Sequence, residues 1–254
     1  MNKDNKIYLY NGSFTDLINL IDYLLKNKII PSNIKDINYN KGLFDEVINI
    51  KTNSSNLINN LINISSIYVF KIIYYVYLSD DDNKELIIYY FILNTFKYKN
   101  KIIYMRNLKC VSEGLRLEKY VSRENHKFKG FTRFKELNNN ILYAKINPTN
   151  NILVLLTNHF KNRLKNECFI LHDIKRNIYA FYDKNKYYII SDKELKLLNI
   201  EYSKNEKDIQ NMWCSFYKIV AIKERKNERV RMNFMPKKYW ENIIEMRNIN
   251  ENSN

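Results

Sequence analysis

Glycine and proline are both scarce in this 254-residue sequence, which contains four glycines and three prolines. The glycines lie far apart, so neither the Walker nor the Rossmann glycine pattern, in which backbone N–H groups cradle phosphates, is present. Three scattered prolines do not make a proline-rich linker between domains. These shortages exclude the common nucleotide-binding loops. The glycines are Gly12, Gly42, Gly114 and Gly130.

Cysteine is also scarce, since the sequence contains Cys110, Cys168 and Cys214 alone. An odd, widely spaced set predicts neither a disulfide framework nor a zinc site, and it is typical of a reducing compartment. The serine-nucleophile elbow and the zinc-deaminase signature are missing as well. We therefore expect no metal or other cofactor and a cytoplasmic location.

Long hydrophobic runs are missing too, although 45% of the residues are hydrophobic and 14% aromatic, as in a globular protein. The N-terminus passes directly into Ile7–Tyr10 without the apolar core of a signal peptide. The most apolar run, 64–78, is interrupted by serines and a lysine, and it is shorter than the roughly 20 residues that span a bilayer. We expect no membrane association.

Arginine is absent from the first 105 residues, where twelve Lys oppose ten Asp and Glu. Residues 106–254 contain twenty Lys and ten Arg against seventeen acidic residues, so a net charge of +13 lies in this part, against +2 before it. Arginine binds phosphate in a bidentate manner and stacks on rings, which lysine does not. The C-terminal half is therefore predicted to bind a polyanion.

The most basic stretch runs from Phe216 to Trp240, with aromatic residues at both ends. Between Lys218 and Lys238, eight Lys and Arg face two Glu, which gives a local net charge of +6. Such a mixture suits a polyanion with flat bases, because cations neutralise phosphates and rings stack. It is equally typical of a solvated helix face between two segments anchored in the core.

The first hundred residues are expected to form a helical region with one edge strand. Ile7–Tyr10 reads as that strand, and Ser13 with Asp16 as a capping-box start of a helix. Residues 44–50 form a second strand or an extended connection. Helices follow at 54–78, broken near 63–66, and at 86–98, with Asp82 capping the latter.

The remaining chain predicts an α+β region in which a mostly antiparallel sheet, in the order β-β-α-β-β-β, is flanked by helices. We expect residues 1–105 and 106–254 to form one continuous domain that ends in basic helices. An amphipathic helix containing Trp213 and Phe216 runs on into the basic stretch, and Pro236 starts a last helix. The other expected elements are a helix at 108–127 ended by Gly130, a hairpin at 131–146, a helix at 152–164, and strands at 168–174, 178–182 and 187–190.

The three histidines, His126, His159 and His172, match no common metal motif. His172 and Asp173, at a strand end, are candidates for general acid and base, and so is His126. Adjacent strand residues point to opposite faces, however, so His172 and Asp173 are not expected to touch. Both can equally cap the sheet edge.

A second aromatic and basic cluster surrounds His126, where Phe128, Phe131 and Phe134 alternate with cations; these rings can equally be core. The cations of this cluster belong to the surface that is predicted to bind nucleic acid. The residues predicted to bind nucleic acid are Arg123, Lys127, Lys129, Arg133, Arg163, Lys175, Arg176, Lys223, Arg225, Lys226, Arg229, Arg231, Lys237 and Lys238.

Six stretches, in order and spacing across nearly the whole chain, resemble a bacterial family of predicted DNA-metabolism or DNA-repair proteins with a domain of unknown function. The stretches are Tyr8–Phe14 (YLYNGSF), Val121–Phe134 (VSRENHKFKGFTRF), Leu171–Arg176 (LHDIKR), Ala180–Asp183 (AFYD), Ala221–Asn227 (AIKERKN) and Phe234–Trp240 (FMPKKYW).

The resemblance implies a DNA-repair context, because members of that family are encoded beside a radical S-adenosylmethionine protein and some are fused to a uracil-DNA-glycosylase-like domain. It implies no catalytic residues.

Two hypotheses about function follow from the charge pattern and the resemblance. The first is a DNA-binding protein that presents DNA to the radical S-adenosylmethionine partner. The second is an enzyme that modifies a base or the backbone with His126, His172 and Asp173, and with Arg133 and Arg176 as phosphate clamps. A third, an RNA-binding or anionic-membrane-binding module, rests on charge alone.

Overall fold

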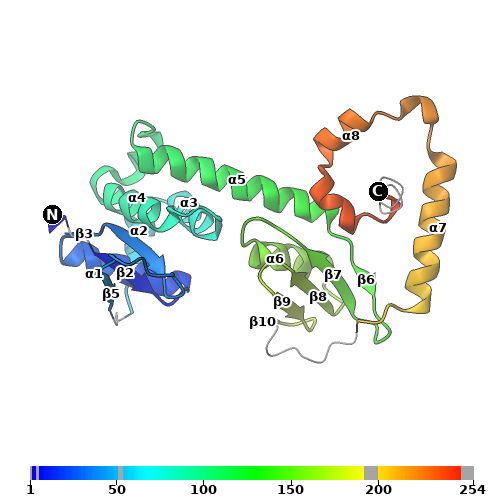
Figure 1. The fold of residues 1–254 in the computed structure, drawn as a ribbon, viewed down its shortest axis with the longest axis horizontal. Coiled ribbons are helices and arrows are strands. Elements are labelled where there is room, and N and C mark those ends of the chain that lie inside the picture. Colours follow the sequence, from blue (N-terminus) through cyan, green and yellow to red (C-terminus); the bar gives the residue numbers. More distant parts are fainter. Residues whose placement is uncertain (1, 4–5, 51–53, 192–199, 247–254) are drawn as a thin grey trace. The chain divides into compact units, whose positions relative to one another are not determined.

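A computed structural model describes residues 2–3, 6–50, 54–191 and 200–246 (Figure 1). The chain divides into two compact units, residues 1–122 and 123–254. The division falls inside one helix, α5 (Lys109–Phe131), and not at residue 105. The fold is α+β, as expected, with a mostly helical first part and a sheet flanked by helices in the second.

Unit 1 is built on a parallel sheet in which β2 (Ile7–Tyr10) lies between β4 (Asn33–Asp36) and β5 (Val47–Asn49). The strand expected at an edge is thus the middle one, and that expectation is wrong. All four residues of β2 are buried, as in strands covered on both faces, which lack a polar alternation. A second, two-stranded parallel pair joins β1 (Asn2–Lys3) to β3 (Ile29–Ile30).

Two helices of unit 1 begin at a serine cap, Ser13 and Ser66. Ser13 accepts a hydrogen bond from the Asp16 N–H at 3.0 Å and donates one to its carboxylate at 2.7 Å, which confirms the predicted start of α1 (Phe14–Lys26). The predicted break falls between α2 (Leu57–Ile64) and α3 (Ile67–Leu78). The capping role predicted for Asp82 is wrong, because the residue at the N-cap of α4 (Lys84–Tyr98) is Asn83.

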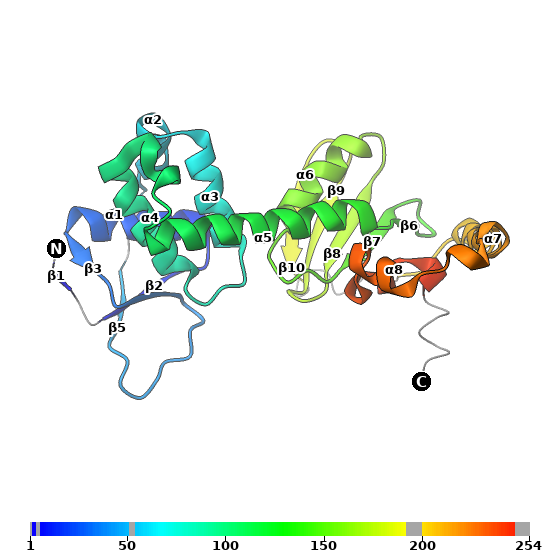
Figure 2. The same ribbon diagram turned by 90° about the horizontal axis from the view of Figure 1, so that it is seen from above.

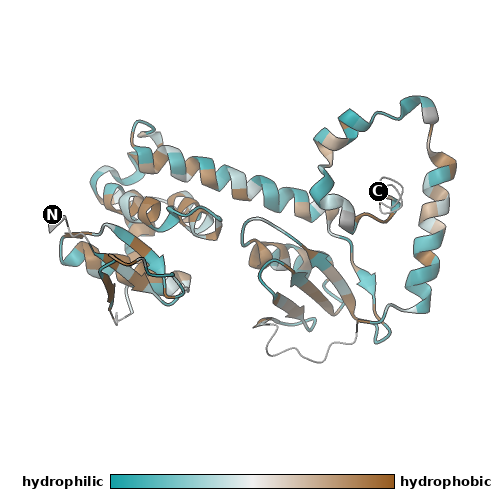
Figure 3. Ribbon diagram, in the orientation of Figure 1, coloured by the Kyte–Doolittle hydropathy of each residue, from teal (hydrophilic) through white to brown (hydrophobic). Residues whose placement is uncertain are grey.

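The helices of unit 1 enclose its core. Figure 3 shows hydrophobic residues on α3, on α4 and on the strands, and many of these residues are buried in this core. A short 3-10 helix, η1 (Lys99–Tyr104), leads toward α5 and buries Ile102 in the same core. Within the described ranges, every helix is too short or too polar to cross a bilayer.

Unit 2 contains the predicted sheet, in the strand order β10-β9-β8-β7-β6. β6 and β7 form a hairpin, and α6 (Leu153–Arg163) is the crossover that allows β7 and β8 to run parallel. The other pairings are antiparallel, which confirms the β-β-α-β-β-β interpretation. The strands are β6 (Lys135–Glu136), β7 (Leu142–Ile146), β8 (Phe169–Asp173), β9 (Ile178–Tyr182) and β10 (Tyr187–Ser191).

The last part of unit 2, residues 204–242, is called the C-terminal arm below. It contains α7 (Lys204–Val220), η2 (Lys223–Arg225), α8 (Glu228–Phe234) and η3 (Lys237–Asn242). The basic stretch therefore does not continue α7, because the chain becomes extended at Ala221 and Asn227 caps a new helix. The start of α7 contacts β6, and both views show the rest of the helix away from the strands of its unit (Figures 1 and 2).

Two glycines of α5, Gly114 in unit 1 and Gly130 in unit 2, differ in how closely they are packed. A Cβ added at Gly114 would lie 3.1 Å from the ring of Phe91, whereas one at Gly130 would meet no atom within 4 Å. We expect Gly114→Leu to lower the free energy of unfolding by about 1–3 kcal/mol through overpacking. Gly130→Ala should raise it by about 0.5 kcal/mol, because alanine favours helix. Urea unfolding followed by circular dichroism measures both. If Gly114→Leu proved at least as stable as the wild type, the packing of Gly114 against Phe91 would be contradicted.

Candidate nucleic-acid interface

The C-terminal arm is held at one end by a buried carboxylate. Glu124 lies on the face of α5 that also contains Val121 and Phe128, and only 4% of its surface is exposed. Its oxygens accept hydrogen bonds from the backbone N–H groups of Thr149 and Asn150, at 3.0 and 2.8 Å. The Asn150 amide adds a third, at 2.6 Å. Glu124 thereby ties α5 to the loop that follows β7.

The fourth partner of Glu124 is Lys238 of η3, whose Nζ lies 2.7 Å from Oε1. Burial alone would raise the pKa of Glu124, but the hydrogen bonds from Lys238 and from the backbone of the 149–150 loop outweigh it, and the pKa is lowered. Burial would lower the pKa of Lys238, but Glu124 raises it above its usual value. Both groups are therefore charged at neutral pH, and their ion pair fixes η3 to α5.

Aromatic packing completes this end of the arm. The ring of Tyr239 lies 5.0 Å from that of Phe128 and 5.1 Å from that of Phe131, and both Tyr239 and Trp240 are buried. The Trp240 indole donates a hydrogen bond to the Met235 carbonyl at 2.8 Å. Phe128 and Phe131 thus belong to the packing of the arm against α5. Phe134 packs elsewhere, against Phe160 and Phe169.

The other end of the arm is fixed by Glu206, the one buried residue of α7. Its carboxylate lies 3.5 Å from the Arg133 guanidinium and accepts hydrogen bonds from the Glu136 N–H and from Gln210. Ser203 caps α7 and also donates to the Glu136 carboxylate at 2.9 Å. The arm is therefore anchored on β6 at its start and on α5 at its end.

Between these anchors the predicted cations are mostly exposed. Arg225, Lys226 and Arg229 are exposed, and Lys226 pairs with Glu228 at 3.5 Å. Among the described residues, no carboxylate lies within ion-pair distance of Arg225 or Arg229. The side chain of Lys223 lies outside the part that the structure describes.

Other predicted cations contact aromatic rings of the arm. The Arg231 guanidinium lies 5.0 Å from the centre of the Trp240 ring, and Lys237 lies 5.9 Å from it. Lys127 of α5 lies 6.0 Å from the Tyr239 ring. These contacts place cations of α5, α8 and η3 around the buried rings.

The remaining predicted cations lie on α5, on α6 and in the turn after β8. Arg123 on α5 and Arg163 at the end of α6 are exposed, and Lys129 is half-buried. Burial first, and then the charges of Lys129 and Arg163, lower the pKa of His159. Lys175 is exposed and donates to the Thr149 carbonyl at 3.3 Å.

Asp173 and Arg176 support the same loop that Glu124 binds. Asp173 is fully buried and pairs with Arg176 at 3.0 Å, while the Arg176 guanidinium also donates to the carbonyls of Pro148 and Thr149. Burial raises the pKa of Asp173, and Arg176 opposes that rise. These contacts hold residues 148–150 from a second side. The phosphate contact predicted for Arg176 and the acid–base role predicted for Asp173 stay predictions.

The histidines have separate surroundings. His126 is exposed on α5, and His159 on α6 packs beside Phe160. His172 Nδ1 lies 2.8 Å from the Tyr143 hydroxyl, and its ring stacks on Tyr179 with centres 4.0 Å apart. His172 and Asp173 thus have different partners. Among the residues that the structure describes, no three His, Cys, Asp or Glu side chains gather in a way that could hold a metal ion.

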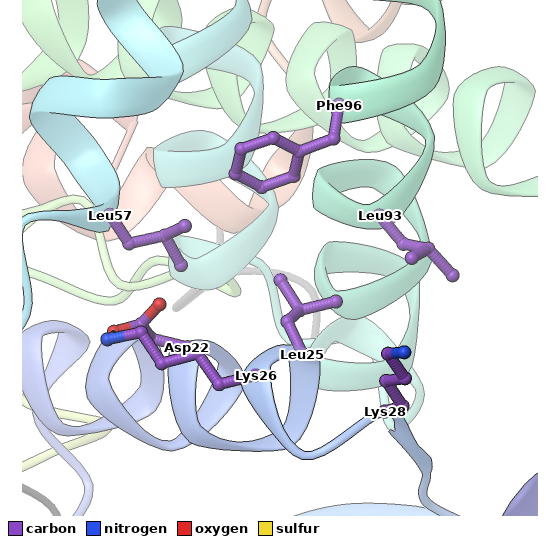
Figure 4. Close-up of a pocket in the computed structure, with 7 residues that line it drawn as sticks. All are labelled: Asp22, Leu25, Lys26, Lys28, Leu57, Leu93 and Phe96. Carbon is purple, nitrogen blue, oxygen red and sulfur yellow. Dashed lines mark hydrogen bonds and ion pairs between the residues drawn. The ribbon is translucent and has the colours of Figure 1, made fainter. Parts of the chain in front are cut away.

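An apolar groove of about 460 Å³ lies in unit 1 between α1, α2 and α4 (Figure 4). Leu25, Leu57 and Phe96 are among its lining residues, and the Asp22–Lys26 ion pair lies at its rim at 2.7 Å. This pair is an ordinary i,i+4 contact on a helix surface. The groove contains no predicted site residue.

The sequence interpretation missed Glu124 and Glu206 as the anchors of the arm. The position of Glu124 in the helical period was the signal, because it falls between Val121 and Phe128 on the buried face of α5. A charge at such a position needs a buried partner. No comparable signal marks Glu206, whose partner Arg133 is remote in the sequence.

Removing the charge of Glu124 tests the anchor of η3. We expect Glu124→Gln to lower the free energy of unfolding of unit 2 by about 2 kcal/mol at pH 7, because hydrogen bonds to a charged group are lost. Because the pKa of Glu124 is lowered in the folded state, its contribution is complete above its usual value of 4.5 and disappears as pH falls through the lowered value. The difference between wild type and variant should therefore shrink in acid. Urea unfolding can be followed by fluorescence, because both tryptophans, Trp213 and Trp240, lie in unit 2.

The matched control is Glu228→Gln, also in unit 2, where the exposed carboxylate pairs with Arg231 in an i,i+3 contact at 3.4 Å. This substitution should cost less than about 0.5 kcal/mol. Equal losses in the two variants, or a Glu124→Gln loss that does not change with pH, would show that Glu124 is not the anchor.

The sequence matches, over residues 82–245, a family described as a domain of unknown function (DUF4130). No curated protein and no solved structure matches the chain significantly. The family match covers more than half of the chain, including α5, the sheet of unit 2 and the C-terminal arm. The chain therefore belongs to the DUF4130 family.

Proposed function

We propose that this protein binds DNA through the C-terminal arm and the adjoining end of α5, and that it acts in DNA repair or DNA metabolism. The observation that carries the proposal is the exposure of Arg225 and Arg229 in a segment with a local net charge of +6. Unpaired guanidinium groups are suited to bidentate contacts with phosphate.

The anchoring of the arm supports this function. A flexible basic tail loses conformational freedom when it binds, which reduces its affinity. The arm is already ordered by the Glu206–Arg133 contact at its start and the Glu124–Lys238 ion pair at its end. Its exposed cations are thus held in place before DNA arrives, so less ordering is needed on binding.

The resemblance to predicted DNA-repair proteins supports a partner. We propose that the protein acts in the cytoplasm with a radical S-adenosylmethionine protein, which carries out the chemistry while this chain holds the DNA. The association of some similar proteins with a uracil-DNA-glycosylase-like domain points to the same context. The alternative, catalysis by His126, His172 and Asp173, has less support, because Asp173 is fully buried in an ion pair and His172 contacts other side chains.

The salt dependence of DNA affinity tests the binding function. If about five phosphates are neutralised, log K should fall against log salt with a slope of about −4.5 on duplex DNA, or about −3.5 on single strands. Replacing Arg225 and Arg229 together by Ala should make the slope on a duplex less negative by about 1.8, because each phosphate contact contributes about 0.9 to it. Fluorescence anisotropy of a labelled DNA measures both.

The control replaces two exposed cations of unit 1, Lys41 and Arg106, by Ala, which changes the net charge by the same amount. This variant should keep the wild-type slope. Affinity that hardly changes between low and moderate salt, or an equal loss in both double variants, would contradict binding through the arm.

The proposed partner is tested by purifying the protein together with a radical S-adenosylmethionine protein encoded beside it and comparing DNA affinity with and without that protein. Co-purification with tighter DNA binding is expected. Separate elution and unchanged affinity would remove the partner from the proposal and leave DNA binding intact.

A further inference from the structure

The helix α7 is exposed along almost its whole length, its apolar residues included. In a surface helix of a globular protein, the apolar face is normally buried and the charged face exposed. In α7 the buried residue is the charged Glu206, while its large apolar residues are exposed. The exposed ones are Ile209, Met212, Trp213, Phe216, Tyr217, Ile219 and Val220. A group of exposed apolar residues of this kind is a candidate binding surface.

Two aromatic rings lie together on this face of α7. Trp213 and Phe216, 41% and 56% exposed, are one helical turn apart, and their ring centres are 5.9 Å apart. The Trp213 indole N–H donates to the Glu245 carboxylate at 2.8 Å, which fixes the orientation of the ring. Trp213 and Phe216 thus form a held, partly exposed pair, unlike Trp240, which is only 4% exposed.

Exposed cations and a further exposed ring follow this pair along the chain into α8. Phe234, at the end of α8, is 77% exposed, and Lys218, Arg225 and Arg229 are exposed between it and the Trp213–Phe216 pair. Positive charge therefore predominates in the segment that carries the exposed rings. Such a surface is complementary to a polyanion whose flat groups can reach the rings.

On the basis of the proposed function, we infer that the C-terminal arm binds single-stranded nucleic acid in preference to duplex, with bases stacked on Trp213 and Phe216 and phosphates on Arg225 and Arg229. In a duplex the base faces are covered by their neighbours in the stack, so protein rings reach only base edges in the grooves. In a single strand each base exposes a face that stacks on an aromatic side chain.

Duplex binding would use the cations of the arm but leave its exposed rings uncovered. A single strand covers both, because phosphates and bases alternate along it. A protein partner would also cover the rings, but it would have to supply carboxylates opposite Lys218, Arg225 and Arg229. Charge complementarity thus favours the single strand, and a protein or lipid occupant is left as an outcome of the test.

The experiment compares labelled oligo(dT) of 15 nucleotides with a 15-base-pair duplex, at the same salt concentration and with the full chain. We expect oligo(dT) to bind at least about tenfold more tightly and to quench the fluorescence of Trp213 by stacking. Trp240 is buried and should not respond. The variant Trp213→Phe should therefore lose most of the quenching while it keeps a ring and most of the affinity.

Replacing Trp213 and Phe216 together by Ala should weaken oligo(dT) binding by at least about tenfold and leave duplex binding unchanged. The matched control is Phe44→Ala, which removes a 92% exposed ring from unit 1. Its oligo(dT) affinity should equal that of the wild type. Circular dichroism of each variant confirms that the helices are retained.

The outcomes separate this inference from the proposed function. Equal affinity for oligo(dT) and duplex, without quenching, would overturn the single-strand preference and leave DNA binding in place. Binding of neither DNA would overturn both. Self-association through α7 in sedimentation, or binding to phosphatidylserine vesicles in preference to oligo(dT), would assign the exposed face to another occupant and likewise overturn the inference.

Discussion

The buried charge of Glu124 is the constraint on which the structure of unit 2 depends. A carboxylate that is removed from water is costly unless hydrogen bonds and an opposite charge replace the water. Around Glu124 these are supplied by the 149–150 loop and by Lys238, which come from two different parts of the chain. Satisfying this single group brings α5, the loop after β7 and the end of the arm together. The Asp173–Arg176 pair then holds the same loop from β8.

The polar anchors explain how the C-terminal arm can present apolar residues to solvent. An amphipathic helix normally docks through its apolar face, and that face is then no longer accessible. The arm instead docks through Glu206 at the start of α7, and through Lys238 and two buried rings in η3. The surface between the anchors is thereby left for a partner, which in our proposal is nucleic acid.

Local signals in the sequence predicted most elements correctly, because caps and periodicity act over a few residues. Ser13 with Asp16, and the serines between α2 and α3, are examples. The central position of β2 was not predictable in this way, since its parallel neighbours are distant in the sequence and parallel pairing leaves no local turn signal. The spacing of Trp213 and Phe216 predicted an amphipathic helix, but periodicity alone does not distinguish a face that packs on the core from one that remains exposed. The candidate cations were visible as a charge pattern, whereas their anchors, Glu124 and Glu206, depend on long-range contacts.

The Glu124–Lys238 ion pair joins residues that are 114 positions apart. During synthesis, Glu124 therefore leaves the ribosome long before its partner is made. Domains generally fold as units as the chain emerges, with the N-terminal part first. Unit 1 can be complete at a time when the carboxylate of Glu124 still depends on water and on the 149–150 loop. The docking of η3 on α5 is thus a late step in the maturation of the protein. A chain that ends before Lys238 would lack the charge that lets Glu124, and with it this face of α5, become buried.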